Sequence, residues 1–140
     1  MTSKTIEIQS GNIVIELKRD GKPTGELSFD PKDIIFAEKY YAMFSAIQQE
    51  QEKYKREYLV LSKDQTKDKD GMPKNMPKLL KLTRDVAQFM RQQIDNLFGD
   101  GVSQAAFGDS MNIEIYPQFL EQITPFVEQV RSEKVEKYTK

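Results

Sequence analysis

The sequence predicts an α+β fold that is mostly α-helical: an N-terminal β-hairpin, then three main helices and a short helical turn. Apolar residues near the N-terminus recur at every second position, which is the period of a half-buried strand. Three later segments carry apolar residues at spacings of three and four, the period of an amphipathic helix. With 140 residues, the chain is long enough for one ordinary domain and short for two.

The β-hairpin is predicted to run from about Asn12 to Phe29. Asp20-Gly21-Lys22-Pro23 has the composition of a tight turn between two strands. Ser10-Gly11-Asn12 is either a turn or a bulge between two pieces of the alternating run. The residues that alternate are Ile6, Ile8, Ile13, Ile15, Leu17, Leu27 and Phe29.

A long first helix is predicted over about Pro31 to Ser62. Asp30-Pro31 favours a helix start, because an aspartate accepts hydrogen bonds from first-turn amides and proline is tolerated at the first helical position. A helix of about 30 residues extends roughly 45 Å, too long for so small a domain to cover completely. Its C-terminal half therefore either pairs with the second helix as a projecting hairpin or awaits a partner.

The rest of the chain is predicted as a charged loop, two further main helices and a tail. Residues 63–77 have no apolar periodicity and form a mobile, solvated loop. The second helix runs from about Lys78 to Phe98, where Gly99 offers a left-handed cap, and Ser103 caps a single helical turn. The third main helix covers about Pro117 to Lys134 and has a kink or break near Ile123, because Pro125 lies inside it. Residues 1–134 form one domain, and residues 135–140 a frayed tail.

The chain has no cysteine and no histidine, which excludes several kinds of active site. Disulfides, thiolate zinc sites and cysteine nucleophiles are impossible, as are serine triads and histidine-based metal centres. We expect no enzyme activity, no catalytic residue, no cofactor and no metal.

Charge and hydropathy argue against nucleic-acid and membrane partners. The 21 basic and 22 acidic residues give a formal net charge of −1, without the long basic run that a nucleic-acid footprint needs. No apolar run approaches the roughly 20 residues that span a bilayer, and the N-terminus lacks a signal-peptide core. We expect a cytoplasmic protein.

Three patterns that resemble binding or catalytic sites are better explained as ordinary structure. Thr66–Gly71 resembles half of a calcium loop, but Pro77 stands where the closing glutamate belongs. Glu50, Glu52 and Glu57 alternate with basic residues and predict an exposed, salt-bridged helix face rather than an acid–base pair. The glycines between Phe98 and Asp109 lack a phosphate-binding lysine, and each is expected to end a helix or to permit a positive φ.

Three segments in this order resemble the tail assembly chaperones of long-tailed, siphovirus-type phages and prophages of Gram-positive bacteria. They are FDPKDIIFAEKYYAMF, QQIDNLFGDGVSQAAFGD and NIEIYPQFLEQITPF. The resemblance spans about Leu27 to Arg131 and is most specific from Ile94 to Asp109, where the FGD tripeptide occurs twice.

The resemblance implies a non-catalytic protein that binds the tape-measure protein and helps to recruit tail tube subunits. It implies action in the cytoplasm of the bacterial host and absence from the mature virion, and it leaves a homo-oligomer open. A frameshifted longer product is common in such families, and the SEKVEKYTK tail is where it would arise. Two alternatives remain: a small structural virion component, such as a head–tail connector or tail-completion protein, and a mobile-element regulatory adaptor.

The candidate partner surface combines the exposed part of the first helix with phenylalanines of the later helices. For each phenylalanine, a place in the core is the competing interpretation. The candidate protein-binding residues are Tyr54, Tyr58, Leu61, Phe98, Phe107, Phe119 and Phe126.

Overall fold

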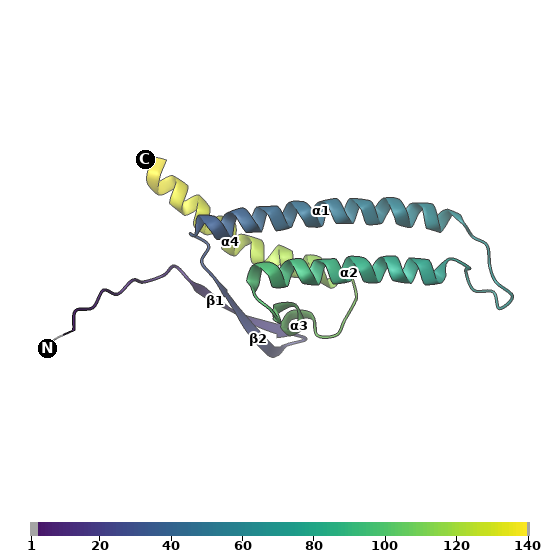
Figure 1. The fold of residues 1–140 in the computed structure, drawn as a ribbon, viewed down its shortest axis with the longest axis horizontal. Coiled ribbons are helices and arrows are strands. Elements are labelled where there is room, and N and C mark those ends of the chain that lie inside the picture. The colour runs from purple at the N-terminus through teal and green to yellow at the C-terminus, as the bar shows by residue number, and fades with distance from the viewer. Residues whose placement is uncertain (1–2, 140) are drawn as a thin grey trace.

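The computed structural model describes residues 3–139 and the side chains of residues 3–128. It contains a β-hairpin followed by helices, which confirms the predicted α+β, mostly α fold (Figure 1). The elements are β1 (Ile13–Arg19), β2 (Lys22–Phe29), α1 (Ile34–Lys63), α2 (Met76–Phe98), α3 (Val102–Phe107) and α4 (Ile115–Thr139).

β1 and β2 form the predicted antiparallel hairpin, in which Ile13 lies opposite Phe29. Asp20 and Gly21 both have positive φ, 54° and 80°, which is the requirement of a two-residue hairpin turn. A register shift follows Leu17. At Gly25 the sheet packs so closely on α3 that a Cβ would lie 2.9 Å from the Ala105 side chain, so only glycine fits.

α1 begins later than predicted, because Asp33 rather than Asp30 caps it. The Ile35 amide donates to the Asp33 carboxylate at 2.9 Å. Asp30 instead accepts from the Lys32 and Gly11 amides, at 3.0 and 3.3 Å, and so joins the segment before β1 to the turn before α1.

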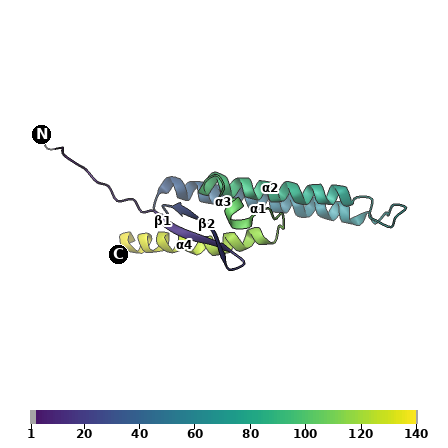
Figure 2. The ribbon, with the colours of Figure 1, turned by 90° about the horizontal axis from the view of Figure 1, so that it is seen from below.

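α1 and α2 form an antiparallel hairpin that projects beyond the other elements (Figures 1 and 2). The Tyr54 and Thr83 hydroxyls lie 3.3 Å apart, and the buried Asn75 side chain donates to the Leu61 carbonyl. The first of the two predicted possibilities, pairing with the second helix, is therefore confirmed.

The charged segment predicted to be a mobile loop has a defined turn between the two helices. Lys67 and Pro73 form an isolated antiparallel bridge, and the Lys74 amide donates to the Thr66 carbonyl at 2.9 Å. The Asp68 carboxylate accepts from the Asp70 and Met72 amides at 2.9 and 3.0 Å. α2 then begins at Met76, two residues before the predicted start.

α4 continues through Pro125, so the predicted break near Ile123 is wrong. Pro125 is exposed, and the hydroxyl of the preceding Thr124 donates to the Leu120 carbonyl at 2.7 Å. The helix also extends through the segment predicted to fray, to Thr139, because no glycine or proline follows Pro125 to stop it. Lys140 lies outside the described residues.

One apolar core joins the sheet to all of the described helices. The core lies where the β-hairpin and α4 pack against the half of the α1–α2 pair that is nearer the sheet, which we call the inner half. In the outer half, near the loop between α1 and α2, the two helices pack only against each other (Figure 2). The largest fully buried side chains include Tyr40, Met90, Ile94, Tyr116 and Val127.

Candidate functional site

The two FGD tripeptides end two helices and place their phenylalanines in the core. Phe98 and Phe107 are the last residues of α2 and α3, with Gly99 and Gly108 as the caps. Their exposed fractions are 8% and 5%, which agrees with the competing interpretation that they belong to the core. Both rings contact Phe119 edge-on, with centroids 5.6 and 5.7 Å away.

The glycines near these phenylalanines have positive φ, as predicted, but the cap geometry differs in detail. Gly99 has φ 123° and ψ 151°, outside the left-handed helical region that the sequence predicted. Ser103 does not cap α3. Gly101 occupies the N-cap position, and Ser103 is buried in the first turn.

Two polar side chains of α2 hold this region, and the sequence did not single them out. The Asp95 carboxylate accepts from the Ser103 amide at 2.7 Å and from its hydroxyl at 3.0 Å, so a side chain of α2 satisfies the start of α3. Arg91 donates to the Gly108 carbonyl, to the Ser110 carbonyl at 2.8 Å and to the Tyr116 hydroxyl at 3.1 Å. Neither role leaves a periodic signal, because the partners come from other elements.

The remaining predicted partner residues fall into two places. Tyr54, Tyr58 and Leu61 lie on the outer half of the α1–α2 hairpin, where Tyr58 is 43% exposed and the other two are half-buried in the interhelical seam. Phe126 is 47% exposed on α4, and Phe119 is half-buried beside it. The structure does not bring the seven residues together.

The outer half of the hairpin carries more exposed apolar surface than the sequence indicated. Three consecutive α1 residues, Tyr58 to Val60, are exposed. Because successive helical positions point about 100° apart, these apolar side chains are spread around the helix rather than along one face. Leu80 of α2 lies at the same level, because Tyr54 lies beside Thr83 and Leu61 beside Asn75. We call this set the hairpin-end patch: Tyr58, Leu59, Val60, Met72 and Leu80.

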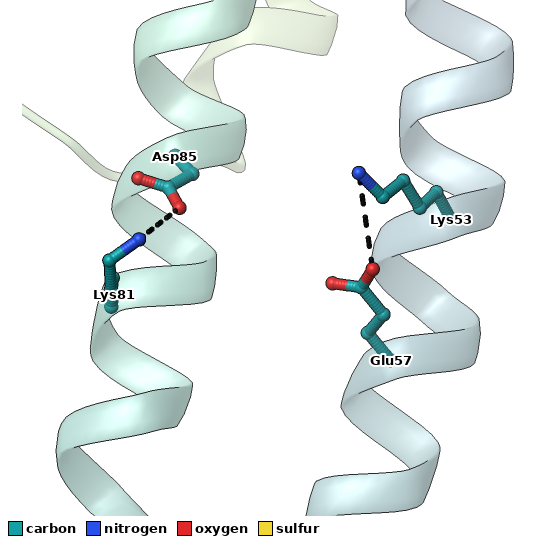
Figure 3. Close-up of polar contacts among 4 residues, drawn as sticks. All are labelled: Lys53, Glu57, Lys81 and Asp85. Carbon is teal, nitrogen blue, oxygen red and sulfur yellow. Dashed lines mark hydrogen bonds and ion pairs between the residues drawn. The ribbon is translucent and has the colours of Figure 1, made fainter.

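Basic residues predominate in the part of the chain that carries the hairpin-end patch. Residues 53–84 contain ten basic and four acidic residues, although the whole chain is close to neutral. Among the described residues, the salt bridges are two exposed i,i+4 pairs on this hairpin, Lys53–Glu57 at 4.0 Å and Lys81–Asp85 at 3.0 Å (Figure 3). The Lys53–Glu57 pair agrees with the salt-bridged face predicted for the first helix, and most basic residues of the hairpin lie outside the two pairs.

A groove of about 550 Å³ lies between β1 and α4. Its β1 wall includes both apolar and charged residues, and its α4 wall includes Phe119, Ile123 and Phe126. α3 contributes Phe107 at the base. The sequence singled out Phe119 and Phe126 but not the strand that faces them.

The described side chains contain no group of three or more acidic residues that could hold a metal ion. Burial raises the pKa of Tyr40, against the opposing effect of its hydrogen bond to Thr124. Hydrogen bonds from Thr66 lower the pKa of the exposed Asp64 carboxyl at the end of α1. Both pKa shifts have structural causes.

Within the part of the chain that the structure describes, no helix is apolar and long enough to span a bilayer.

Comparison with known proteins identified a family. A protein family described as a family of unknown function, DUF6673, matches residues 24–140, from β2 through every described helix. No curated protein and no solved structure matches the chain.

Proposed function

The chain belongs to the DUF6673 family, and we propose that it is a tail assembly chaperone of a long-tailed phage or prophage. In this proposal it binds the tape-measure protein and helps to recruit tail tube subunits, without chemistry of its own. It acts in the bacterial host cytoplasm and is absent from the finished particle. The sequence resemblance and the hairpin-end patch support this proposal independently.

The observation that carries the proposal is the exposed apolar surface at the projecting end of the hairpin. Leu59, Val60 and Leu80 are 59%, 69% and 62% exposed on well-formed helices, where folding alone does not require apolar residues. Several exposed apolar side chains gathered at one end of a helical pair can mark a protein-binding site. A helical pair offers such a surface to the apolar face of a partner helix.

A tape-measure protein supplies the kind of partner that this surface fits. Long helices with apolar stripes aggregate unless the stripes are covered, and a chaperone must later release them to the assembling tube. A small apolar patch with a charged rim suits reversible binding better than a large, dry interface does. The basic rim favours acidic segments of the partner helices.

Co-expression with the tape-measure protein tests the proposal. The wild-type chain should keep that protein soluble, and the double variant L59D/L80D should lose most of this effect because it places two charges in the patch. I35D is the matched control, because Ile35 lies on the same helix and is 58% exposed, but at the other end. Solubility that does not depend on the chain, or that both variants preserve equally, would contradict the proposal.

Mass spectrometry of purified particles tests the remaining part. A chaperone is absent from mature particles, whereas a head–tail connector or tail-completion protein is present in stoichiometric amounts. Finding the chain in the particles would replace the chaperone proposal with the structural one.

A further inference from the structure

The N-terminal segment before β1 has the pattern of a strand but pairs with no strand among the described residues. Residues 3–12 are extended and outside any helix or strand. Ile6 and Ile8 are 90% and 82% exposed, the two highest values among the exposed large apolar side chains of the described part. They are two residues apart, so in a strand they point to one face while Glu7 points to the other. We call residues 3–10 the N-terminal arm.

β1 offers an edge on which such a strand could pair. The described sheet has two strands, so β1 pairs with β2 on one side and has its other edge free. An unpaired strand edge is a template for another strand. The groove runs along β1, from Ile15 to Asp20, with α4 as its opposite wall.

The apolar side chains of the arm are complementary to the apolar side chains that line the groove. A strand added to β1 would place one row of its side chains inward, beside the row that contains Ile15 and Leu17. Ile6 and Ile8 in that row would cover Phe126 of α4, which lines the groove and is 47% exposed. Glu7 would then lie in the outward row, which in β1 contains the exposed Lys18.

The arm does not turn back onto β1 of its own chain. The Gly11 amide donates to the Asp30 carboxylate at 3.3 Å, and that carboxylate lies so close that a Cβ on Gly11 would meet it at 2.5 Å. The chain is thereby held beside the end of β2, away from the free edge of β1. In both ribbon views the arm leads away from the sheet (Figures 1 and 2).

We propose that the N-terminal arm of one copy adds to the free edge of β1 in a second copy, with Ile6 and Ile8 seated in the groove between β1 and α4. The eight residues of the arm reach about 26 Å when extended, which carries Ile6 and Ile8 away from the sheet of their own chain. A two-fold arrangement in which both arms exchange closes as a dimer, because each copy offers both the arm and the edge. This association uses the sheet end of the molecule and is independent of the hairpin-end patch.

The mass in solution tests the proposal first. Light scattering coupled to size-exclusion chromatography should find the full chain associated, and I6D/I8D monomeric at the same concentration. T5D/Q9D is the matched control, because it adds the same two charges to the same arm in the outward row and should remain associated. A wild-type chain that is monomeric throughout, or two double variants that dissociate equally, would overturn the proposal.

Disulfide trapping tests the pairing of the arm with β1 directly. Because the chain has no cysteine of its own, only the introduced cysteines can form a disulfide. A chain carrying E7C, mixed with a larger tagged chain carrying K18C, should form a mixed disulfide-linked dimer. E7C mixed with tagged E57C, whose cysteine lies on the hairpin, should not. The double variant E7C/K18C should link between chains. If it links only within one chain, the arm pairs with its own β1 and the proposal fails.

Discussion

Arg91 connects α2 to the irregular segment between α3 and α4. Its guanidinium donates to two carbonyls of that segment and to the Tyr116 hydroxyl of α4, and lies 5.8 and 5.9 Å from the ring centroids of Phe107 and Tyr116. Charged donors in such partly buried positions stabilise more than neutral ones, and losing them leaves carbonyls without partners.

Replacing Arg91 with methionine should lower the free energy of unfolding by about 2 kcal/mol, because the Gly108 and Ser110 carbonyls lose a charged donor. Urea denaturation measures the change. K81M is the control: it removes only the exposed pair with Asp85 shown in Figure 3, which is worth less than about 0.5 kcal/mol. Equal effects of the two variants would contradict the role given to Arg91.

Tyr40 makes stability depend on pH above neutrality. Its hydroxyl lies 2.6 Å from the Thr124 hydroxyl, and burial raises its pKa above the usual value of 10.0. The folded state therefore retains this proton more strongly than the unfolded state. The resulting stability is complete below pH 10 and is lost as pH rises through the folded pKa.

The Y40F variant should accordingly lose part of the fall in unfolding free energy above pH 10. Chemical denaturation at a series of alkaline pH values measures the slope. The control is Y58F, near the other end of the same helix and 43% exposed, which should retain more of the wild-type fall. A Y40F profile parallel to that of the wild type would show that the alkaline loss has another source.

At the scale of elements, the sequence predicted helices and strands well and their ends less well. Hydrophobic periodicity identifies α1 and α2 because each buries one stripe. It cannot choose between Asp30 and Asp33 as the α1 cap, since both are good cap residues and the choice depends on Gly11. It also cannot separate core phenylalanines from exposed ones, because Phe98 and Phe107 are buried by elements distant in sequence.

The partner surface was the least predictable part for the same reason. Tyr54 and Leu61 belong to the apolar stripe of α1 and are half-buried in its seam with α2. Leu59, Val60 and Leu80 lie off the stripes and remain exposed. Apolar residues outside a regular stripe were therefore the better signal for exposed apolar surface, whereas residues inside it form the seam between α1 and α2.

α4 tolerates a proline that ought to weaken it. Pro125 lacks the amide that would donate to the Glu121 carbonyl, yet the helix continues on both sides. P125A should raise the free energy of unfolding by about 1 to 3 kcal/mol, because it restores this bond on an exposed face. Thermal and urea denaturation measure the gain.

P117A is the control, because Pro117 lies in the first turn of α4, where its missing amide has no helical partner to lose. It should change stability by less than about 1 kcal/mol. A loss of stability in P125A would mean that the proline ring itself contributes contacts that alanine cannot replace.

At the scale of the whole molecule, charge is divided along the long axis. The outer hairpin, residues 53–84, has ten basic against four acidic residues, so the remainder of the nearly neutral chain is acidic. Such a division steers an acidic partner to the hairpin end and disfavours side-by-side contact between two hairpins. Net charge alone conceals this, because the two regions cancel.

Binding to the proposed tape-measure partner should therefore weaken with salt, mainly through slower association. At about 1 M salt the screening length falls to about 3 Å, which removes steering but leaves apolar contact. K78E/K81E, in the outer part of the α1–α2 hairpin, should slow association at low salt. K32E/K39E, near the start of α1 and outside residues 53–84, should not. Stopped-flow or surface-plasmon measurements give both rate constants. Association that is independent of salt, or that both charge reversals slow equally, would place the contact away from the hairpin end.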